Sequence, residues 1–500
     1  MRATETRRGA EPATAFGWRF SAPLFVSATL NPINSSLMAT AIVPIAAAVG
    51  VSVGRTAVLI SALYLATAIA QPTAGKLAEV FGARRILLTG IAGVVLGGLI
   101  GGVGTSLAVL VVARVLIGVG TSCAYPSAML LIRRRATEAG LEAPPGRILG
   151  GLVIAGTVTA AAGLPIGGAL VDAWGWRTTF LINIPVAVVA LVLTLAWVPA
   201  DPKAVENRMF RRTLSELDVV GIVGFGGALA ALLVFLLSLP HPAWIVLVLA
   251  VGLGVGLMWW ELHARTPFID VRMLITHAAL IRTYVRFAVT TMCMYTVLYG
   301  VTQWLQAGQG LSARTAGLLL LPMTGLAALI AQPVATRNLV RAPLIAAGVS
   351  CLVGSIGVLL IHSGTPVVWI VGVTLVFGIT LGTTATANQT ALYNQVPAEQ
   401  IATASGLLRS CGYLGSIASS AVISLVFHTS VDDHGLHVIG WILVGVSAIG
   451  VIALALDPIV APQRLLRRRR TSRAGHTAPT HDIAEPQDPC ASTETMRRQS

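Results

Sequence analysis

Few side chains in the apolar segments of this 500-residue sequence could do chemistry. Arg114 is the clearest candidate, because it begins the segment Arg-Val-Leu-Ile-Gly-Val-Gly inside a long apolar run that also contains Pro126. A charged residue inside such a run is costly and is by default a functional candidate. Arg114 could instead brace neighbouring helices by donating hydrogen bonds to their backbone carbonyl groups. Both interpretations stay open from the sequence.

Uncharged polar side chains inside apolar runs form the second group of candidates. They are Asn31, Asn34 and Ser35 in the first run, Tyr295, Tyr299 and Gln303 in a later one, and Asn388 and Gln389 in a third. Amide groups would be costly against lipid, so we expect these side chains to face a central cavity or to form hydrogen bonds between helices.

Groups that would indicate catalysis are missing from the sequence. It contains no Gly-x-x-x-x-Gly-Lys-Ser/Thr loop for phosphates, no catalytic His/Asp cluster in a loop and no metal-binding spacing. Acidic residues and histidines fall near the ends of apolar runs, as at Asp172, Asp218, Glu261 and His362. We therefore expect no enzyme activity, no cofactor and no metal. The candidate residues indicate binding of a small molecule.

The composition indicates the environment in which these residues lie. Hydrophobic residues make up 55% of the chain and charged residues only 11%, and the mean hydropathy is +0.80, whereas soluble proteins carry roughly 25% charged residues. The chain is therefore expected in a lipid bilayer. Its net charge of +14 comes from connectors and tails, where membrane topology explains basic residues, so we do not expect nucleic acid as a partner.

Fourteen stretches are apolar enough to cross a hydrocarbon core of about 30 Å, which predicts an all-α integral membrane protein. They lie at about 20–45, 57–75, 86–104, 107–132, 148–172, 178–198, 219–239, 243–261, 284–306, 316–335, 343–362, 366–393, 402–427 and 437–456. Basic residues occupy alternate connectors, and the opposite connectors carry only Arg55, Arg177 and Arg314. The positive-inside rule thus predicts both termini in the cytoplasm of a multi-pass protein of the plasma (inner) membrane.

An internal repeat predicts how the spans are grouped. The core Ile-Ala-Gln-Pro occurs at Ile69 and again at Ile330, near the ends of the second and tenth stretches. Spans one to six and nine to fourteen are therefore expected to form two six-helix bundles, with spans seven and eight as an inserted pair. The predicted domains are an N-terminal tail (1–19), the first bundle (20–198), a loop and the inserted pair (199–261), an interfacial loop (262–283), the second bundle (284–456) and a disordered basic cytoplasmic tail (457–500).

The segment Gly-Lys-Leu-Ala-Glu-Val-Phe-Gly-Ala-Arg-Arg, which follows the first repeat, resembles the loop between spans two and three of the major facilitator superfamily. The resemblance implies a cytoplasmic latch made by Gly75, Glu79, Gly82, Arg84 and Arg85. A glycine at position 75 would let two helices approach closely. The carboxylate of Glu79 could accept bonds from an arginine or a helix N-terminus, and Gly82 would permit a tight turn.

Two further segments are similar to motifs of the fourteen-span drug:proton antiporter branch of that superfamily. The Arg114 segment resembles the span-four motif, although Ile117 stands where the family often has Gln. Gly163, Pro165, Gly167 and Gly168 resemble the span-five antiporter motif, with the proline displaced by one position. They are expected to form a gating helix or simply a close packing surface.

Span one departs from that branch, because Ser35 stands where the family commonly has an aspartate. The usual carboxylate carrier for a coupling proton is then absent, so protons are only a candidate coupling ion. The resemblance implies a secondary active transporter that exports amphiphilic small molecules by alternating access, as multidrug efflux proteins do. Two alternatives are a transporter of a neutral or anionic metabolite with atypical or no proton coupling, and a membrane sensor or scaffold that does not transport.

Overall fold

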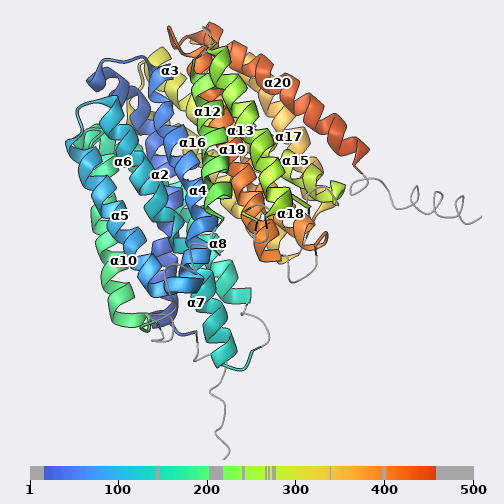
Figure 1. The fold of residues 1–500 in the computed structure, drawn as a ribbon. Helices are drawn as coiled ribbons and strands as arrows, with labels where there is room; N and C mark the ends of the chain where they lie inside the picture. Colours follow the sequence, from blue (N-terminus) through green and yellow to red (C-terminus); the bar gives the residue numbers. More distant parts are fainter. Residues whose placement is uncertain are drawn as a thin grey trace, which may run out of the picture. The chain divides into compact units, whose positions relative to one another are not determined.

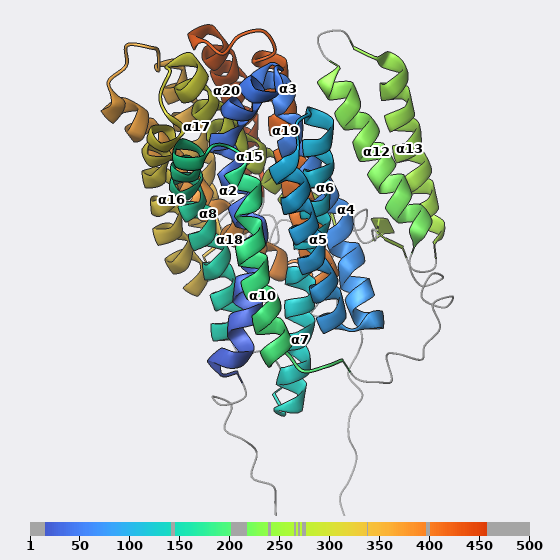
Figure 2. The ribbon, with the colours of Figure 1, turned by 90° about the vertical axis from the view of Figure 1, so that its left-hand side faces the viewer.

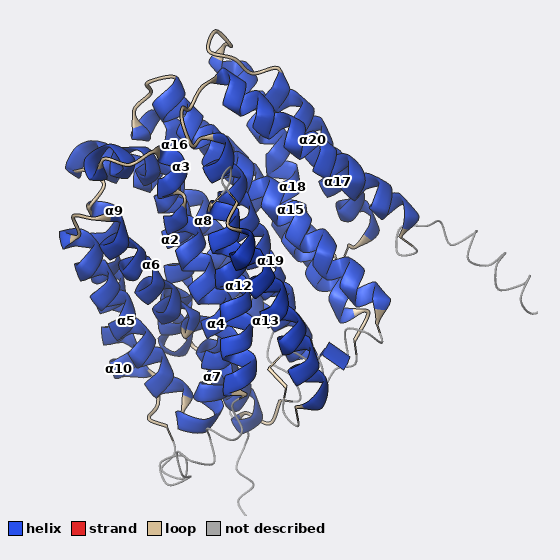
Figure 3. Ribbon diagram, turned by 45° about the horizontal axis from the view of Figure 1, so that its top comes forward, coloured by secondary structure: helices blue, strands red, loops and turns tan. Residues whose placement is uncertain are grey.

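The computed structural model describes residues 16–141, 146–201, 218–238, 242–264, 267–268, 271–272, 277–337, 339–396 and 401–457. The described residues up to Leu454 form one compact unit, and residues from Ala455 onward belong to a second unit. Within the described ranges the secondary structure is entirely helical, as Figure 3 shows. Residues 1–15 and 458–500 of the predicted tails lie outside the described residues, as do residues 265–266, 269–270 and 273–276 of the predicted interfacial loop.

The helices follow one another in a simple order. The first half of the larger unit, as we name it, consists of α2 (Trp18–Val49), α3 (Val53–Thr56), α4 (Val58–Phe81), α5 (Ala83–Val103), α6 (Leu107–Ser122), α7 (Ala124–Glu138), α8 (Gly146–Trp174), α9 (Thr178–Leu181) and α10 (Asn183–Trp197). Next come α12 (Val219–Leu237) and α13 (Trp244–His263). The second half consists of α15 (Ala278–Gln303), η2 (Trp304–Gly308), α16 (Ala313–Thr336), α17 (Arg341–Leu359), α18 (Val367–Tyr393), α19 (Ile401–Val426) and α20 (Asp433–Leu456).

Eleven candidate membrane spans occur within the described residues, each long and apolar enough to cross a bilayer. The predicted all-helical membrane protein is therefore confirmed. Three further long helices, α8, α15 and α19, also match predicted stretches but are not among the eleven. The arrangement of fourteen spans remains a prediction.

Two predicted stretches differ in detail from the structure. The stretch at 107–132 lies within one candidate span, Leu107–Glu138, whose helix is interrupted at Cys123 and so consists of α6 and α7. Pro126 lies in the first turn of α7, where its missing amide hydrogen costs no helical bond. The stretch expected at 284–306 begins earlier, at Ala278, and ends in the π-helical turn η2.

The two halves use equivalent helix pairs. In the first half α2 packs on α8 and α4 on α6, and in the second half α15 packs on α19 and α16 on α18. Between the halves, α8 packs on α16 and α4 packs on α19. Exchanging the halves converts one of these cross-pairs into the other, as expected for two related bundles. We call the two cross-pairs together the seam.

The helix pair α12 and α13 lies beside the two halves (Figure 2). Its members pack on each other, and α12 also contacts α4 and α19. The Asp218 carboxylate caps α12 by accepting a bond from the Gly221 amide at 2.8 Å, and it also accepts the Trp260 indole N–H at 2.7 Å. One carboxylate therefore ties the ends of both helices together.

The two copies of the sequence repeat lie towards the carboxyl-terminal ends of α4 and α16. Pro72 lies within α4, which continues to Phe81, whereas Pro333 lies close to the end of α16 at Thr336. The expectation that each copy closes its helix therefore holds for α16 only. α4 continues because residues 73–81 contain no further proline, and Gly75, the one glycine among them, disfavours the helix by only about 1 kcal/mol.

Candidate functional site

Arg114 lies at the centre of the first half, in α6, with only 1% of its surface exposed. Its Nε donates to the carbonyl oxygen of Leu59 at 3.1 Å, and its Nη1 donates to that of Asn34 at 3.4 Å. Among the described residues, its Nη2 has no hydrogen-bond partner. Arg114 thus braces α4 and α2, which is one of the two interpretations of the sequence. Its Nη2 is a buried donor that these contacts leave unsatisfied. A buried donor of this kind is costly unless a water or ligand satisfies it.

Tyr299 connects this centre to the second half. Its hydroxyl donates to the carbonyl oxygen of Ser35 at 3.0 Å and lies 3.3 Å from the hydroxyl of Tyr64. All three residues are buried. Ser35 itself donates its hydroxyl to the carbonyl of Asn31 at 3.2 Å. Two candidates from the sequence, Ser35 of α2 and Tyr299 of α15, therefore lie in contact. Tyr64 of α4 lies beside them, although it was not predicted from the sequence.

Four of the predicted amides form hydrogen bonds between helices. Asn31 of α2 donates to Thr121 of α6 at 3.0 Å, and Asn34 of α2 donates to Asn183 of α10. In the second half, Asn388 of α18 accepts a bond from Arg286 of α15 at 2.9 Å. Gln389, next to Asn388, donates to Ser405 of α19 at 2.7 Å. The structure thus shows the interhelical bonding that the sequence left as one of two alternatives.

Gln303 differs from the other amides. It is fully buried, and neither its Nε2 nor its Oε1 has a hydrogen-bond partner in the described part of the chain. It precedes the π-helical turn η2, whose Trp304 donates its indole N–H to Asp433 at 2.9 Å. π-helical turns inside α-helices are frequent at functional sites. Gln303 therefore remains a candidate, with unsatisfied polar atoms as its distinguishing feature.

Aromatic rings from both halves form a continuous row across the seam. Tyr295 and Tyr299 stack with their centroids 5.7 Å apart, and Tyr64 meets Tyr295 edge-on at 5.4 Å. Tyr64 also stacks on Tyr413 of α19 at 5.8 Å, and the Tyr413 hydroxyl donates to the side chain of Gln71 at 2.7 Å. Tyr295 is thus part of a larger group than the sequence suggested.

Arg409 of α19 lies at one end of this row, one helical turn from Tyr413. Its guanidinium group lies 3.7 Å from the ring centroid of Tyr125 in α7, which makes a cation–π contact across the halves. Neither Arg409 nor Arg286 was predicted from the sequence. The signal was present, because each is an arginine within an apolar run, as Arg114 is.

The glycines of α8 lie where that helix packs most closely. A methyl group at Gly163 or Gly167 would overlap Ser36 or Thr40 of α2. At Gly168 it would overlap the backbone of Ala313, where α16 begins. Pro165 lies in the same helix. The three glycines of the predicted gating motif therefore lie along the contacts that join α8 to α2 and to the second half.

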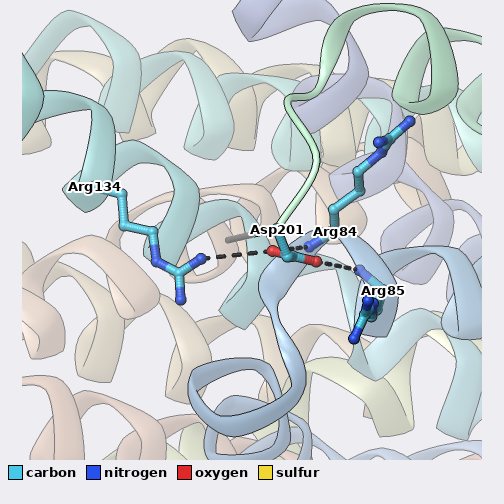
Figure 4. Close-up of polar contacts among 4 residues, drawn as sticks. All are labelled: Arg84, Arg85, Arg134 and Asp201. Carbon is cyan, nitrogen blue, oxygen red and sulfur yellow. Dashed lines mark hydrogen bonds and ion pairs between the residues drawn. The ribbon is translucent and has the colours of Figure 1, made fainter. Parts of the chain in front are cut away.

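The turn between α4 and α5 is held by Asp201, which follows α10 (Figure 4). Its carboxylate accepts the backbone amides of Arg84 at 3.3 Å and of Arg85 at 3.0 Å, and it lies 3.5 Å from Arg134 of α7. Asp201 thereby satisfies the free amides at the start of α5. Gly82 has φ +103°, and a side chain there would overlap Asp201.

Glu79 and Gly75 make looser contacts than expected. Glu79 is exposed and forms no hydrogen bond or ion pair within the described part of the chain. It lines a pocket of about 550 Å³ together with Leu130, Arg133, Arg134, Thr137 and Glu138. A methyl group at Gly75 would meet only Pro126, at an ordinary 3.7 Å. The close helix approach expected at Gly75 is therefore absent from this conformation.

Comparison with known sequences gives a consistent result. The sequence model described as Major Facilitator Superfamily matches residues 24–420. The chain is 30% identical over 422 residues to the uncharacterized MFS-type transporter YwoD of Bacillus subtilis, covering 83% of this chain and 91% of that protein. It is 27% identical over 382 residues to the multidrug resistance protein Stp of Mycobacterium tuberculosis, covering 74% and 68%. It is 34% identical over 274 residues to the tetracenomycin C resistance and export protein of Streptomyces glaucescens, covering 52% and 48%.

Solved structures with the same fold are more distant in sequence. The nucleoside transporter NupG aligns with a TM-score of 0.63 at 11% identity, covering 87% of this chain and 98% of that one. The peptide transporter POT in complex with sulfate aligns with a TM-score of 0.62 at 16% identity, covering 88% and 95%. At such identities the likeness concerns the fold alone.

Proposed function

This chain belongs to the Major Facilitator Superfamily, and from that premise we propose that it is a secondary active transporter that exports amphiphilic small molecules by alternating access. Its relatives include proteins named for multidrug resistance and for export of tetracenomycin C. By analogy, those names support two parts of the proposal, which are the amphiphilic substrates and the outward direction of transport.

The proposal includes the arrangement in the membrane. Fourteen spans form two six-helix bundles with α12 and α13 inserted between them, in the manner of the fourteen-span drug:proton antiporter branch. The equivalent helix pairs of the two halves support this grouping. The distribution of basic residues supports a position in the inner membrane with both termini in the cytoplasm. The α7 end in Figure 1 is then cytoplasmic, and the α3 end is external.

The observation that carries the proposal is the tight closure of the seam towards the α3 end. The amide of Gly54 donates to the carbonyl of Phe427 at 3.2 Å, and Gly168 of α8 lies against the first residue of α16. Midway along both helices, Thr324 of α16 also donates to the carbonyl of Ala161 of α8 at 3.3 Å. These contacts are non-covalent, so the two halves can separate from each other as units. Opening them while closing the α7 end would carry a bound molecule outward.

At the α7 end, the proposed cytoplasmic latch consists of Glu79 and of the turn between α4 and α5, where Asp201 binds the amides of Arg84 and Arg85. Glu79 has no partner among the described residues in this state and would gain one when the halves close at that end. A carboxylate that changes partners between two states can bias their equilibrium, since only differential contacts shift populations.

Transport by inverted membrane vesicles tests the proposal. Vesicles with the protein should accumulate one or more members of a chemically broad panel of amphiphiles, with and without an imposed pH gradient, while vesicles without it should not. A protein that binds panel members but moves none of them would instead be a sensor or scaffold. Dependence on the gradient would support proton coupling.

A further inference from the structure

Two arginines in the membrane-spanning region have no acidic partner. Arg114 donates to two carbonyl groups and keeps Nη2 unsatisfied, and Arg409 contacts the ring of Tyr125. Within the described chain neither arginine forms an ion pair. Each acidic residue described lies at or near the end of a long helix or in a connection. Within the described residues, the charges of Arg114 and Arg409 are therefore not neutralised by carboxylates of the protein.

The row of tyrosine rings joins these two arginines. Tyr299 and Tyr64 lie on the Arg114 side, where Tyr299 bonds to Ser35, the neighbour of Asn34, whose carbonyl accepts from Arg114. Tyr413 stacks on Tyr64 and lies one turn from Arg409 on the same face of α19. The row thus has a cation at each end, and its partly exposed rings are those of Tyr413 and Tyr295, whereas Tyr64 and Tyr299 are fully buried.

The Arg409 end of the row is partly exposed. Arg409, Tyr125, Tyr413 and Gln71 are all half-buried, although they lie between the two halves and contact one another across them. Arg114 at the other end is fully buried. A ligand that enters between the halves would therefore meet Arg409 first and then the aromatic row.

We propose that this site binds amphiphilic anions, with Arg409 as the residue that receives the anionic group and the half-buried rings of Tyr413 and Tyr295 as the surface for the apolar part. The inference rests on the proposed transport function and names the substrate class of that same site. A guanidinium group held over an aromatic ring can still donate from its edge to a carboxylate, sulfonate or phosphate group. A lipophilic cation would instead lie beside uncompensated like charges in a medium of low polarity.

A pair of ions with opposite charge and almost the same shape provides a direct test. Tetraphenylborate and tetraphenylphosphonium each carry four phenyl rings, so their apolar contacts should be alike. Binding of each ion to the purified full-length protein in lipid nanodiscs is measured by its effect on the melting temperature, at free-ion concentrations corrected for the partition of each ion into protein-free nanodiscs. We expect the anion to bind at least about tenfold more tightly than the cation, the size of effect of one charged hydrogen-bond partner.

Three variants locate the effect. Arg409→Gln should weaken anion binding by about tenfold or more and leave cation binding unchanged or improved, whereas Arg409→Lys, which keeps the charge, should retain part of it. Arg314→Gln, a change of an exposed arginine at the start of α16, is the matched control and should have no effect. If Arg409→Gln does not fold, the comparison of the two ions on the unmodified protein still decides.

Equal or stronger binding of the cation, absence of anion binding, or anion binding unaffected by Arg409→Gln would each overturn the inference. Different results would overturn the transport proposal. If the protein binds the anion through Arg409 but vesicles move no member of the panel, the anion site stands and transport does not. If vesicles export cations and the anion does not bind, transport stands and the anion site does not.

Discussion

Gly168 of α8 lies directly against the backbone of Ala313, and one turn along the same contact Gly317 of α16 lies against the carbonyl of Leu164. Each helix thus presents a glycine to the backbone of the other. Small residues at such a crossing let two helices approach closely and also let them separate without disentangling side chains. The seam is closed there by backbone contact.

A larger residue at this crossing should hold the seam open. Gly168→Val would add a branched side chain where a single methyl group already overlaps Ala313. We expect a loss of stability of about 1–3 kcal/mol for the closed conformation and a decrease in vesicle transport of about tenfold or more. Gly325→Ala in α16, where a methyl group meets nothing within 4 Å, is the control and should transport normally. Normal transport by Gly168→Val would show that the seam does not need this contact.

Gly82 and Gly140 form a matched pair for the turn at the latch. Both have positive φ, +103° and +71°, but only at Gly82 would a side chain overlap another residue, Asp201. Gly140→Ala should cost about 1–2 kcal/mol from backbone strain alone. Gly82→Ala should cost a further ~1–3 kcal/mol from the overlap. Melting temperatures of the purified variants measure the difference, and equal values would contradict the role given to Asp201.

Glu79→Gln tests the latch without disturbing the fold. Glu79 is exposed and has no partner among the described residues in this conformation, so its neutralisation should leave the melting temperature unchanged. Transport should nevertheless slow, because the carboxylate is proposed to stabilise the opposite conformation. The rate in vesicles is compared at equal amounts of protein. A rate equal to that of the parent would mean that Glu79 does not take part in the cycle.

Ser35→Asp tests the missing proton carrier. The Ser35 carbonyl accepts the bond from Tyr299, so a change of side chain leaves that acceptor in place. A carboxylate there would supply the negative charge that the span-one motif of the drug:proton antiporter branch usually carries. We expect greater ethidium efflux or a stronger dependence of efflux on the pH gradient. Robust gradient-driven ethidium efflux by the unmodified protein would contradict the premise that Ser35 has removed cation transport.

The sequence predicted the helices well because each needs only a long apolar run, and the observed ends differ from the predicted ones mostly by a few residues. It could not predict Asp201 at the latch, since the contact joins residues far apart in the chain and an aspartate in a connector looks ordinary. Tyr64 and Tyr413 could not be predicted as site residues either, because a tyrosine within a span is usually a packing residue. Arg409 could have been predicted, because it is a charged residue within an apolar run, as Arg114 is.

The helix α12 contacts α4 and α19, which are the two members of one cross-pair of the seam. The elements that pack most closely on the other cross-pair, α8 and α16, are α2, α9, α15 and α18, all from the two halves themselves. The two sides of the protein are therefore unequal towards the surrounding lipid. A compound dissolved in the bilayer would find α12 and α13 across its lateral path on one side, and only the two halves on the other.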